Sequence, residues 1–105
     1  ISDMSHLALP SDVFLIKPDE NLVASFAEDF RRELQVLVER GHINLAIDLS
    51  AIDMIDSRGL AVFVMGYKSV AARGGRLFVL TNNTDFRRLF EVTHINEYVT
   101  ILDAD

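Results

Sequence analysis

Residues 44–73 constrain the fold of this chain more than any other stretch, because their hydrophobic pattern changes period at a polar corner. Residues 44–49, Asn-Leu-Ala-Ile-Asp-Leu, form a short apolar run without a helical stripe, which is typical of a strand buried on both faces of a sheet. Further on, apolar residues recur at steps of three and four, which predicts a helix with one face on that sheet. This stripe consists of Leu60, Phe63, Val64, Tyr67, Val70 and Ala71. Residues 56–59, Asp-Ser-Arg-Gly, lie between the two periods, so we expect any chemistry at this corner.

The rest of the chain alternates between the same two patterns. Apolar runs predict strands, and stripes with the helical period predict helices that end at glycines or near a threonine. The predicted strands are residues 2–9, 13–17, 44–49, 76–81 and 98–102, and the helices between them end near Gly41, Gly74 and Thr93. This ββαβαβαβ order predicts an α/β domain with a mixed, largely parallel sheet and flanking helices joined by right-handed crossovers.

The composition limits the classes of function. The chain has 105 residues, half of them hydrophobic, which is enough for one domain with one core. Its formal net charge of -6 argues against binding nucleic acid or an anionic membrane surface. It has no cysteine, which excludes disulfides and thiolate metal sites, and no apolar run near the roughly 20 residues that span a bilayer. We therefore expect a cytoplasmic protein.

Ser57 is the sharpest candidate for a functional residue, and its position has two interpretations. In the structural one, its hydroxyl is the N-cap of the helix and Gly59 allows a tight corner. In the functional one, the partial positive charge and free amides of a helix start accommodate a phosphate on this serine. The corner also lies at the carboxyl end of a predicted parallel strand, where open α/β sheets usually place ligands.

An esterase-type nucleophile is the enzyme alternative for Ser57. The Gly-x-Ser-x-Gly elbow is absent, because Ile55 and Gly59 flank the serine where two glycines belong. His42 and His94 could serve as a base only if the fold brought one of them to the corner. We therefore expect no catalytic residues.

Three carboxylates approach the corner, and they raise the question of a magnesium site. Asp48, Asp53 and Asp56 carry the oxygen ligands that Mg²⁺ prefers. Aspartates in turns and at strand ends are, however, ordinary structural residues, and no Gly-x4-Gly-Lys-Ser/Thr loop for a nucleotide is present. We therefore expect neither a metal nor any other cofactor.

Apolar and basic side chains near the corner are mostly assigned to the core and to solvated helix faces. An exposed Met54 or Ile55 beside Ser57 would be the centre of a protein interface. Arg58 is expected at the first turn of the helix, pointing outward, because a buried guanidinium without a carboxylate would be too costly. The side chains expected in the core are Leu60, Phe63, Val64, Leu77 and Val79.

Several segments, taken in this order, resemble a STAS domain of the bacterial anti-sigma factor antagonist type. They are residues 44–49, residues 55–60 (Ile-Asp-Ser-Arg-Gly-Leu), the helix to Tyr67-Lys68, residues 74–77 (Gly-Gly-Arg-Leu) and residues 86–90 (Phe-Arg-Arg-Leu-Phe). The resemblance covers roughly residues 13–102, and the ββαβαβαβ order agrees with it. It implies that residues 1–105 form a single STAS domain, which stops where many members add a final helix.

The resemblance implies a regulatory protein that is not an enzyme. In such antagonists, a partner that is both anti-sigma factor and serine kinase phosphorylates the serine that follows the aspartate, here Ser57, and a serine phosphatase reverses the modification. The unphosphorylated form binds the kinase, so the implied binding surface is Asp56, Ser57, Arg58, Gly59 and Leu60. Arg58 departs from the pattern, because the family usually has a small serine or threonine there.

Other STAS domains act without such a switch, in stressosomes, anion transporters and lipid-transport complexes. The sequence therefore leaves three hypotheses open: a phosphorylation-switched regulator of a process such as transcription, a constitutive STAS scaffold, and a small enzyme.

Overall fold

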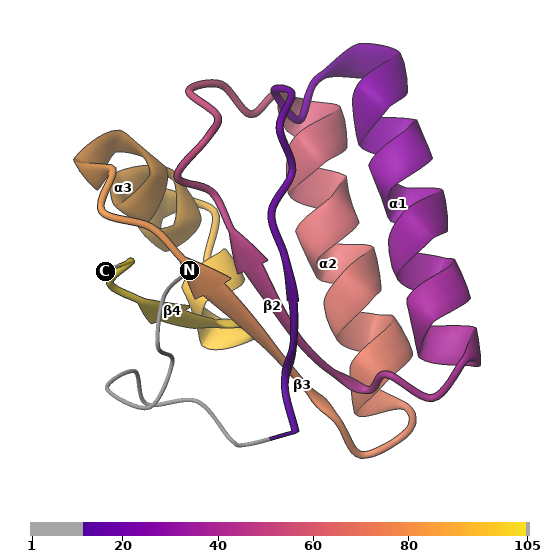
Figure 1. Cartoon of the computed structure of the whole chain (residues 1–105). Helices are drawn as coiled ribbons and strands as arrows, with labels where there is room; N and C mark the ends of the chain where they lie inside the picture. The colour runs from indigo at the N-terminus through magenta and orange to yellow at the C-terminus, as the bar shows by residue number, and fades with distance from the viewer. Residues whose placement is uncertain (1–11, 105) are drawn as a thin grey trace.

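The computed structural model describes residues 12–104, and it confirms the predicted alternation of strands and helices within them. The elements are β1 (Phe14–Ile16), α1 (Ala24–Glu39), β2 (Asn44–Asp48), α2 (Ser57–Ala71), β3 (Arg76–Leu80), α3 (Thr84–Val92), the 3₁₀ helix η2 (Ile95–Glu97) and β4 (Thr100–Leu102) (Figure 1). The strand predicted at residues 2–9 lies outside the described residues.

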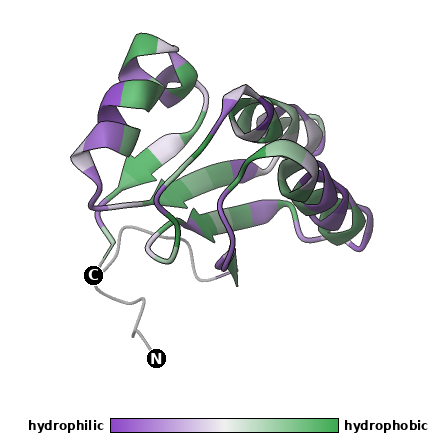
Figure 2. Ribbon diagram, turned by 90° about the horizontal axis from the view of Figure 1, so that it is seen from above, coloured by the Kyte–Doolittle hydropathy of each residue, from purple (hydrophilic) through white to green (hydrophobic). Residues whose placement is uncertain are grey.

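The four described strands are parallel and follow one another in the order β1-β2-β3-β4. Right-handed crossovers between strands in this order bring every connecting helix to the same face of the sheet. Figure 2 shows α1, α2 and α3 together on one side of the strands. The fold is therefore a parallel α/β layer structure in which β2 and β3 are central.

The core lies between the sheet and the three helices. Side chains alternate along a strand, so Leu45 and Ile47 of β2 share a face with their partners Leu77 and Val79 of β3. Each helix contributes phenylalanines to this core: Phe30 of α1, Phe63 of α2, and Phe86 and Phe90 of α3. Phe63 and Phe90 meet edge to face, with ring centroids 5.2 Å apart. Helices distant in sequence are thus held on one sheet face.

Of the five side chains predicted in the core, three are buried as predicted, and two are less buried than predicted. Phe63, Leu77 and Val79 are buried, whereas Leu60 and Val64 are only half-buried and pack against the core from its margin. Ala46, Phe78 and Leu80 on the alternate strand positions are also buried, which confirms that β2 and β3 are covered on both faces.

Several predicted element ends shift. The last strand begins at Thr100 rather than at residue 98, because Tyr98 and Val99 still belong to the turn of η2: both amides donate to the Ile95 carbonyl, at 2.9 and 3.1 Å. The predicted glycine turns are confirmed by the positive φ of Gly41 (97°) and Gly74 (79°), which a residue with a Cβ adopts only with strain. Among residues 12–104, no helix combines the length and the apolar character needed to cross a bilayer.

Candidate functional site

The corner between β2 and α2 is built from two segments that are far apart in sequence. Leu22 lies beside residues 54–56: its amide donates to the carbonyl of Met54 at 3.1 Å, and its carbonyl accepts from the Asp56 amide at 3.2 Å. The side-chain oxygen of Asn21 accepts from the amides of Asp53 (2.9 Å) and Met54 (3.3 Å). The entry to α1 is therefore fastened to the entry to α2.

The carboxylate of Asp56 also connects the two helices, because it accepts hydrogen bonds from backbone amides at the start of each. Its Oδ1 accepts from the Gly59 amide at 2.9 Å and so caps α2. Its Oδ2 accepts at 2.9 Å from the amide of Ala24, the first residue of α1. Val23, the N-cap of α1, makes no side-chain capping bond, so α1 takes its cap from Asp56.

These contacts keep Asp56 ionised. The hydrogen bond from the Ala24 amide is the main reason that the pKa of this carboxyl is lowered, followed by the hydrogen bond from Gly59. The amide and the positive charge of Arg58 lower the pKa further, and desolvation opposes them without reversing the direction. A fixed negative charge therefore lies next to Ser57 at neutral pH.

The structural interpretation of Ser57 as the N-cap of α2 is wrong, because Asp56 occupies that position and Ser57 is the first residue of the helix. A carboxylate one residue earlier reaches the Gly59 amide, so the capping role is filled without the serine. The Ser57 side chain is exposed and, among residues 12–104, its hydroxyl makes no hydrogen bond. The structure therefore leaves the hydroxyl at the helix start available to solvent or a partner.

The other predicted site residues surround this hydroxyl in different ways. Arg58 is exposed, as predicted, whereas Gly59 is buried and Leu60 is half-buried. A Cβ on Gly59 would lie 2.2 Å from the carbonyl oxygen of Leu22, so only glycine lets the two segments approach this closely. Gly59 and Leu60 thus hold the corner together, while Ser57 and Arg58 form its outer surface.

An apolar side chain also reaches the outer surface of the corner. Met54, three residues before Ser57, has 56% of its surface exposed. Its backbone is fixed by Leu22 and Asn21, so the methionine is presented from an anchored loop. An exposed methionine is a common adaptable contact in protein interfaces. The corner thus combines a hydroxyl, a cation and an apolar contact.

The residues of the catalytic and metal hypotheses are engaged elsewhere. The His42 ring packs against Phe14 at a tilt of 42°, with ring centroids 4.4 Å apart. His42 follows the C-terminal end of α1, whose 16 residues span about 24 Å, so it lies far from the corner at the start of that helix. His94 pairs with Glu97 at 2.8 Å. Asp48 accepts from the Ser50 amide at 2.9 Å, and no group of three potential ligands suited to a metal ion is found among residues 12–104.

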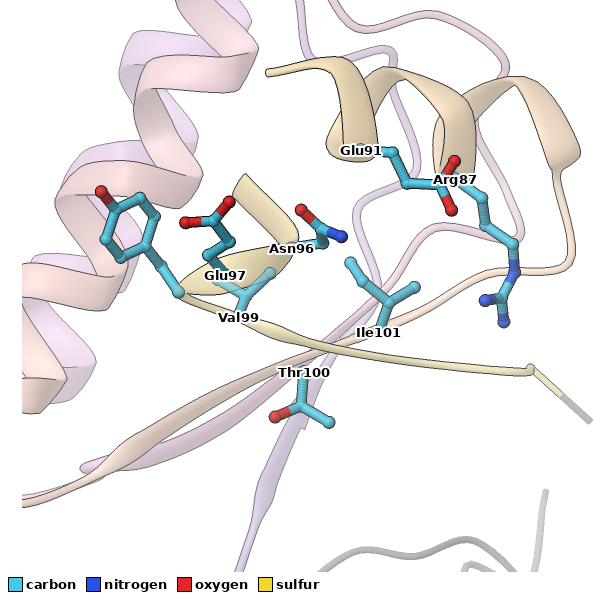
Figure 3. A pocket seen from close by; sticks show the side chains of 8 residues that line it. Arg87, Glu91, Asn96, Glu97, Val99, Thr100 and Ile101 are labelled. Atoms are coloured by element: carbon cyan, nitrogen blue, oxygen red, sulfur yellow. The ribbon is translucent and has the colours of Figure 1, made fainter. Parts of the chain in front are cut away.

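A polar hollow of about 420 Å³ lies away from the corner, between α3 and β4 (Figure 3). None of the predicted site residues lines it. Its one cation, Arg87, already binds Asp103 and the carbonyl of Thr81, and Glu91 and Glu97 add negative charge. This hollow is thus separate from the Ser57 corner.

Sequence reasoning missed the contribution of residues 21–24 to the corner. These residues read as a polar connection followed by a helix, and the contacts to residues 53–56 span more than 30 positions. One local signal was present: Val23 and Ala24 at the start of α1 cannot cap a helix with their own side chains. A helix start without its own cap indicates that the cap comes from another part of the chain.

The sequence comparisons agree with this fold. Residues 7–104 match the STAS domain family, so the chain belongs to that family. It is 32% identical over 79 residues to the anti-sigma-B factor antagonist of Listeria monocytogenes, an alignment that covers 75% of this chain and 69% of that protein. It is also 35% identical over 71 residues to the anti-sigma-B factor antagonist of Bacillus subtilis, covering 68% and 64% of the two chains.

Solved structures show the same architecture. The crystal structure of the Thermotoga maritima protein TM1081 is 25% identical, with a TM-score of 0.83 over 97% of this chain and 92% of that one. Unphosphorylated SpoIIAA, an anti-sigma factor antagonist, is 16% identical and shares the fold, with a TM-score of 0.73 over 92% and 84% of the two chains. Within the STAS family this chain is of the anti-sigma factor antagonist type, a class of regulatory proteins.

Proposed function

We propose that this chain is a cytoplasmic partner-switching protein whose switch is phosphorylation of Ser57. In the unphosphorylated state it binds a serine kinase that is also an anti-sigma factor, and phosphorylation releases that partner. The observation that carries the proposal is the exposed Ser57 hydroxyl, which starts α2 while Asp56 supplies the cap. A kinase reaches such a hydroxyl without displacing any structural hydrogen bond.

The relatives support this proposal at two levels. Proteins named anti-sigma-B factor antagonist are about one third identical to this chain. The fold itself accommodates phosphorylation, because SpoIIAA in its phosphorylated form has the same architecture, with a TM-score of 0.72. We infer that Ser57 carries the modification in this chain and that a serine phosphatase removes it.

The physical basis of the switch is the charge placed at the corner. A phosphate adds about -1.5 to -2 charges at neutral pH next to the ionised Asp56. The free amides at the start of α2 and the Arg58 guanidinium offset part of the repulsion. A partner surface that fits a neutral hydroxyl instead meets a desolvated dianion. We expect binding to weaken by more than about 2 kcal/mol, roughly thirtyfold in affinity.

Ser57 acts as an acceptor of phosphate and not as a catalytic nucleophile. Both oxygens of the neighbouring Asp56 already accept helix amides, and neither His42 nor His94 is hydrogen-bonded to the serine. We expect the purified chain to hydrolyse no simple ester. Turnover of p-nitrophenyl acetate that disappears in Ser57→Ala would contradict this expectation.

The decisive experiment compares binding of the cognate kinase to wild type, Ser57→Ala and Ser57→Asp by calorimetry. Ser57→Asp should lose at least tenfold in affinity, while Ser57→Ala should bind and resist phosphorylation by the kinase and labelled ATP. Asn96→Asp, which is exposed in η2 and distant in sequence from the corner, is the control for adding one negative charge. If Ser57→Asp binds as tightly as wild type and Ser57→Ala is still labelled, the chain is a constitutive STAS scaffold instead.

A further inference from the structure

Ala24 is the first residue of α1, and its backbone has a conformation that a residue with a Cβ rarely adopts. Its φ is 49°, whereas residues of an α-helix have a φ of about -63°. An alanine in this left-handed region is strained, because its Cβ lies close to the following carbonyl oxygen. Residues in such conformations persist only where surrounding contacts hold them, and they cluster at switch regions of proteins.

The contact that holds Ala24 comes from the corner and not from α1. The chain enters the helix through a tight turn, in which the Val23 amide donates to the carbonyl of Asn21, two residues earlier, at 2.9 Å. Val23 makes no side-chain capping bond, and the Ala24 amide donates instead to Oδ2 of Asp56 at 2.9 Å. A carboxylate from a distant segment therefore holds the strained start of α1.

The same carboxylate lies next to the proposed phosphorylation site. Its Oδ1 accepts at 2.9 Å from the Gly59 amide, one of the amides at the start of α2 that have no partner within the helix. A phosphate on Ser57 is attracted to these amides and repels the carboxylate. It also carries the larger charge, about -1.5 to -2 at neutral pH, so it competes with Asp56 for them. Because one carboxylate makes both bonds, a carboxylate that turns away from Gly59 also leaves Ala24.

We propose that phosphorylation of Ser57 releases the strained start of α1 through Asp56. This coupling rests on the proposed function, because it needs a phosphate on Ser57, and it adds a second surface that changes with the switch. Ala24 and Ser25 are exposed, so their release alters the surface beside the corner. The buried stripe of α1 stays in the core, and only the first turn of the helix changes.

Hydrogen exchange of the Ala24 amide, followed by NMR on the full chain, tests this coupling. Phosphoserine is incorporated at position 57 during translation, so no kinase is needed. The Ala24 amide should then exchange at least about fivefold faster than in wild type, as for the loss of an ordinary hydrogen bond, and about as fast as in Asp56→Ala. The Phe30 and Leu34 amides should keep their rates. An unchanged rate at Ala24 overturns the proposal, and so does faster exchange along the whole helix.

Thr84 provides the matched control for a phosphate at a helix start. Like Ser57, it is exposed and is the first residue of its helix, here α3. Its cap, Asn83, accepts from two amides of the same helix, whereas the cap of α2 also holds α1. Phosphoserine at position 84 should therefore leave the exchange of the Ala24 amide unchanged. An acceleration equal to that from position 57 would show a general effect of charge and overturn the proposal.

Ala24→Gly tests the strain itself and does not require that Asp56→Ala folds. Glycine adopts a positive φ readily, so in the unphosphorylated chain the amide at position 24 should be at least about threefold better protected than in wild type. Equal or weaker protection overturns the proposal, because no strain is then available for release. Failure of the cognate kinase to label Ser57 would instead contradict the proposed function, and the coupling measured with incorporated phosphoserine would stand.

Discussion

Asp56 links the stability of the corner to pH. Its two oxygens both accept hydrogen bonds, from the backbone amides at the starts of α1 and α2, only while the carboxyl group is ionised. Its pKa is lowered in the folded chain, so it stabilises the fold above the unfolded pKa of about 3.9. That stabilisation is lost as the pH falls from there through the folded pKa. Asp56 thus holds the starts of α1 and α2 together electrostatically, and it is also the neighbour of the proposed phosphorylation site Ser57.

Replacing Asp56 by Asn should separate these effects. An amide side chain has one acceptor oxygen, so either Ala24 or Gly59 loses its partner. We expect Asp56→Asn to have a lower Tm at pH 7 and a flatter loss of stability as the pH falls below about 4, the ordinary pKa of an aspartate. Thermal melts from neutral to acid pH measure this, with the exposed Asp53→Asn as control. Equal pH profiles for wild type and Asp56→Asn would contradict this assignment.

Gly59 provides a steric test at the same corner, with Gly66 of the same helix as its matched control. A Cβ on Gly59 would overlap the Leu22 carbonyl, and we expect Gly59→Ala to cost at least about 2 kcal/mol. A Cβ on Gly66 would lie 3.5 Å from Leu34 and Leu77, which is an ordinary contact. Gly66→Ala should therefore be neutral or stabilise by about 0.5 to 1 kcal/mol. Urea unfolding compares them, and equal effects would mean that residues 22 and 59 are not in contact.

At the scale of elements, the stability of the fold depends on which face of α2 is turned toward the sheet. Phe63 is fully buried and packs against Phe90, whereas Met65, two residues later, is 46% exposed. Phe63→Ala should cost about 3 to 5 kcal/mol in the free energy of unfolding. Met65→Ala should change it by no more than about 0.5 kcal/mol. Chemical denaturation of both variants measures this difference, and a small effect of Phe63→Ala would show that the helix phase is wrong.

The first helix illustrates how one element depends on another. α1 has the strong apolar stripe that the sequence predicted, with Phe30, Leu34 and Val38 buried, but its start has no capping side chain of its own. It is fixed by the Asp56 carboxylate and by the pairing of Leu22 with residues 54–56. The starts of α1 and α2 therefore form one structural unit.

At the scale of the whole molecule, the proposed switch surface lies outside the core. Ser57 and Arg58 are exposed, while the core is closed by phenylalanines from three helices on one sheet face. A change of charge at the corner should thus alter partner binding and leave the fold intact.

Arg58→Glu tests this separation of binding from folding. The side chain is exposed at the first turn of α2, so we expect the free energy of unfolding to change by less than about 0.5 kcal/mol. The affinity for the cognate kinase should change at least severalfold, because the charge beside Ser57 is reversed. Kinase titrations and thermal melts on the same preparation measure both. A large loss of Tm with unchanged binding would assign Arg58 to the fold instead.

The sequence by itself determined the elements and their order. Strand and helix periods are local properties of a few neighbouring residues, so they predicted β2, α2 and β3 and the turns at Gly41 and Gly74. The order of parallel strands joined by helices then fixed the α/β class. The same local pattern, together with the family resemblance, singled out Ser57 as the candidate site, and its place at the helix start predicted that Arg58 is exposed, as it is.

Only the tertiary structure decided how the corner is built. The bond from Ala24 to Asp56 joins residues 32 positions apart, and the need for glycine at position 59 comes from the Leu22 carbonyl. Leu60 and Val64 are likewise only half-buried, because they pack at the margin of the core, although the helical stripe predicted that they are in the core. Periodicity reports which side of an element is apolar, whereas capping from a distance and the depth of burial depend on which other elements pack there.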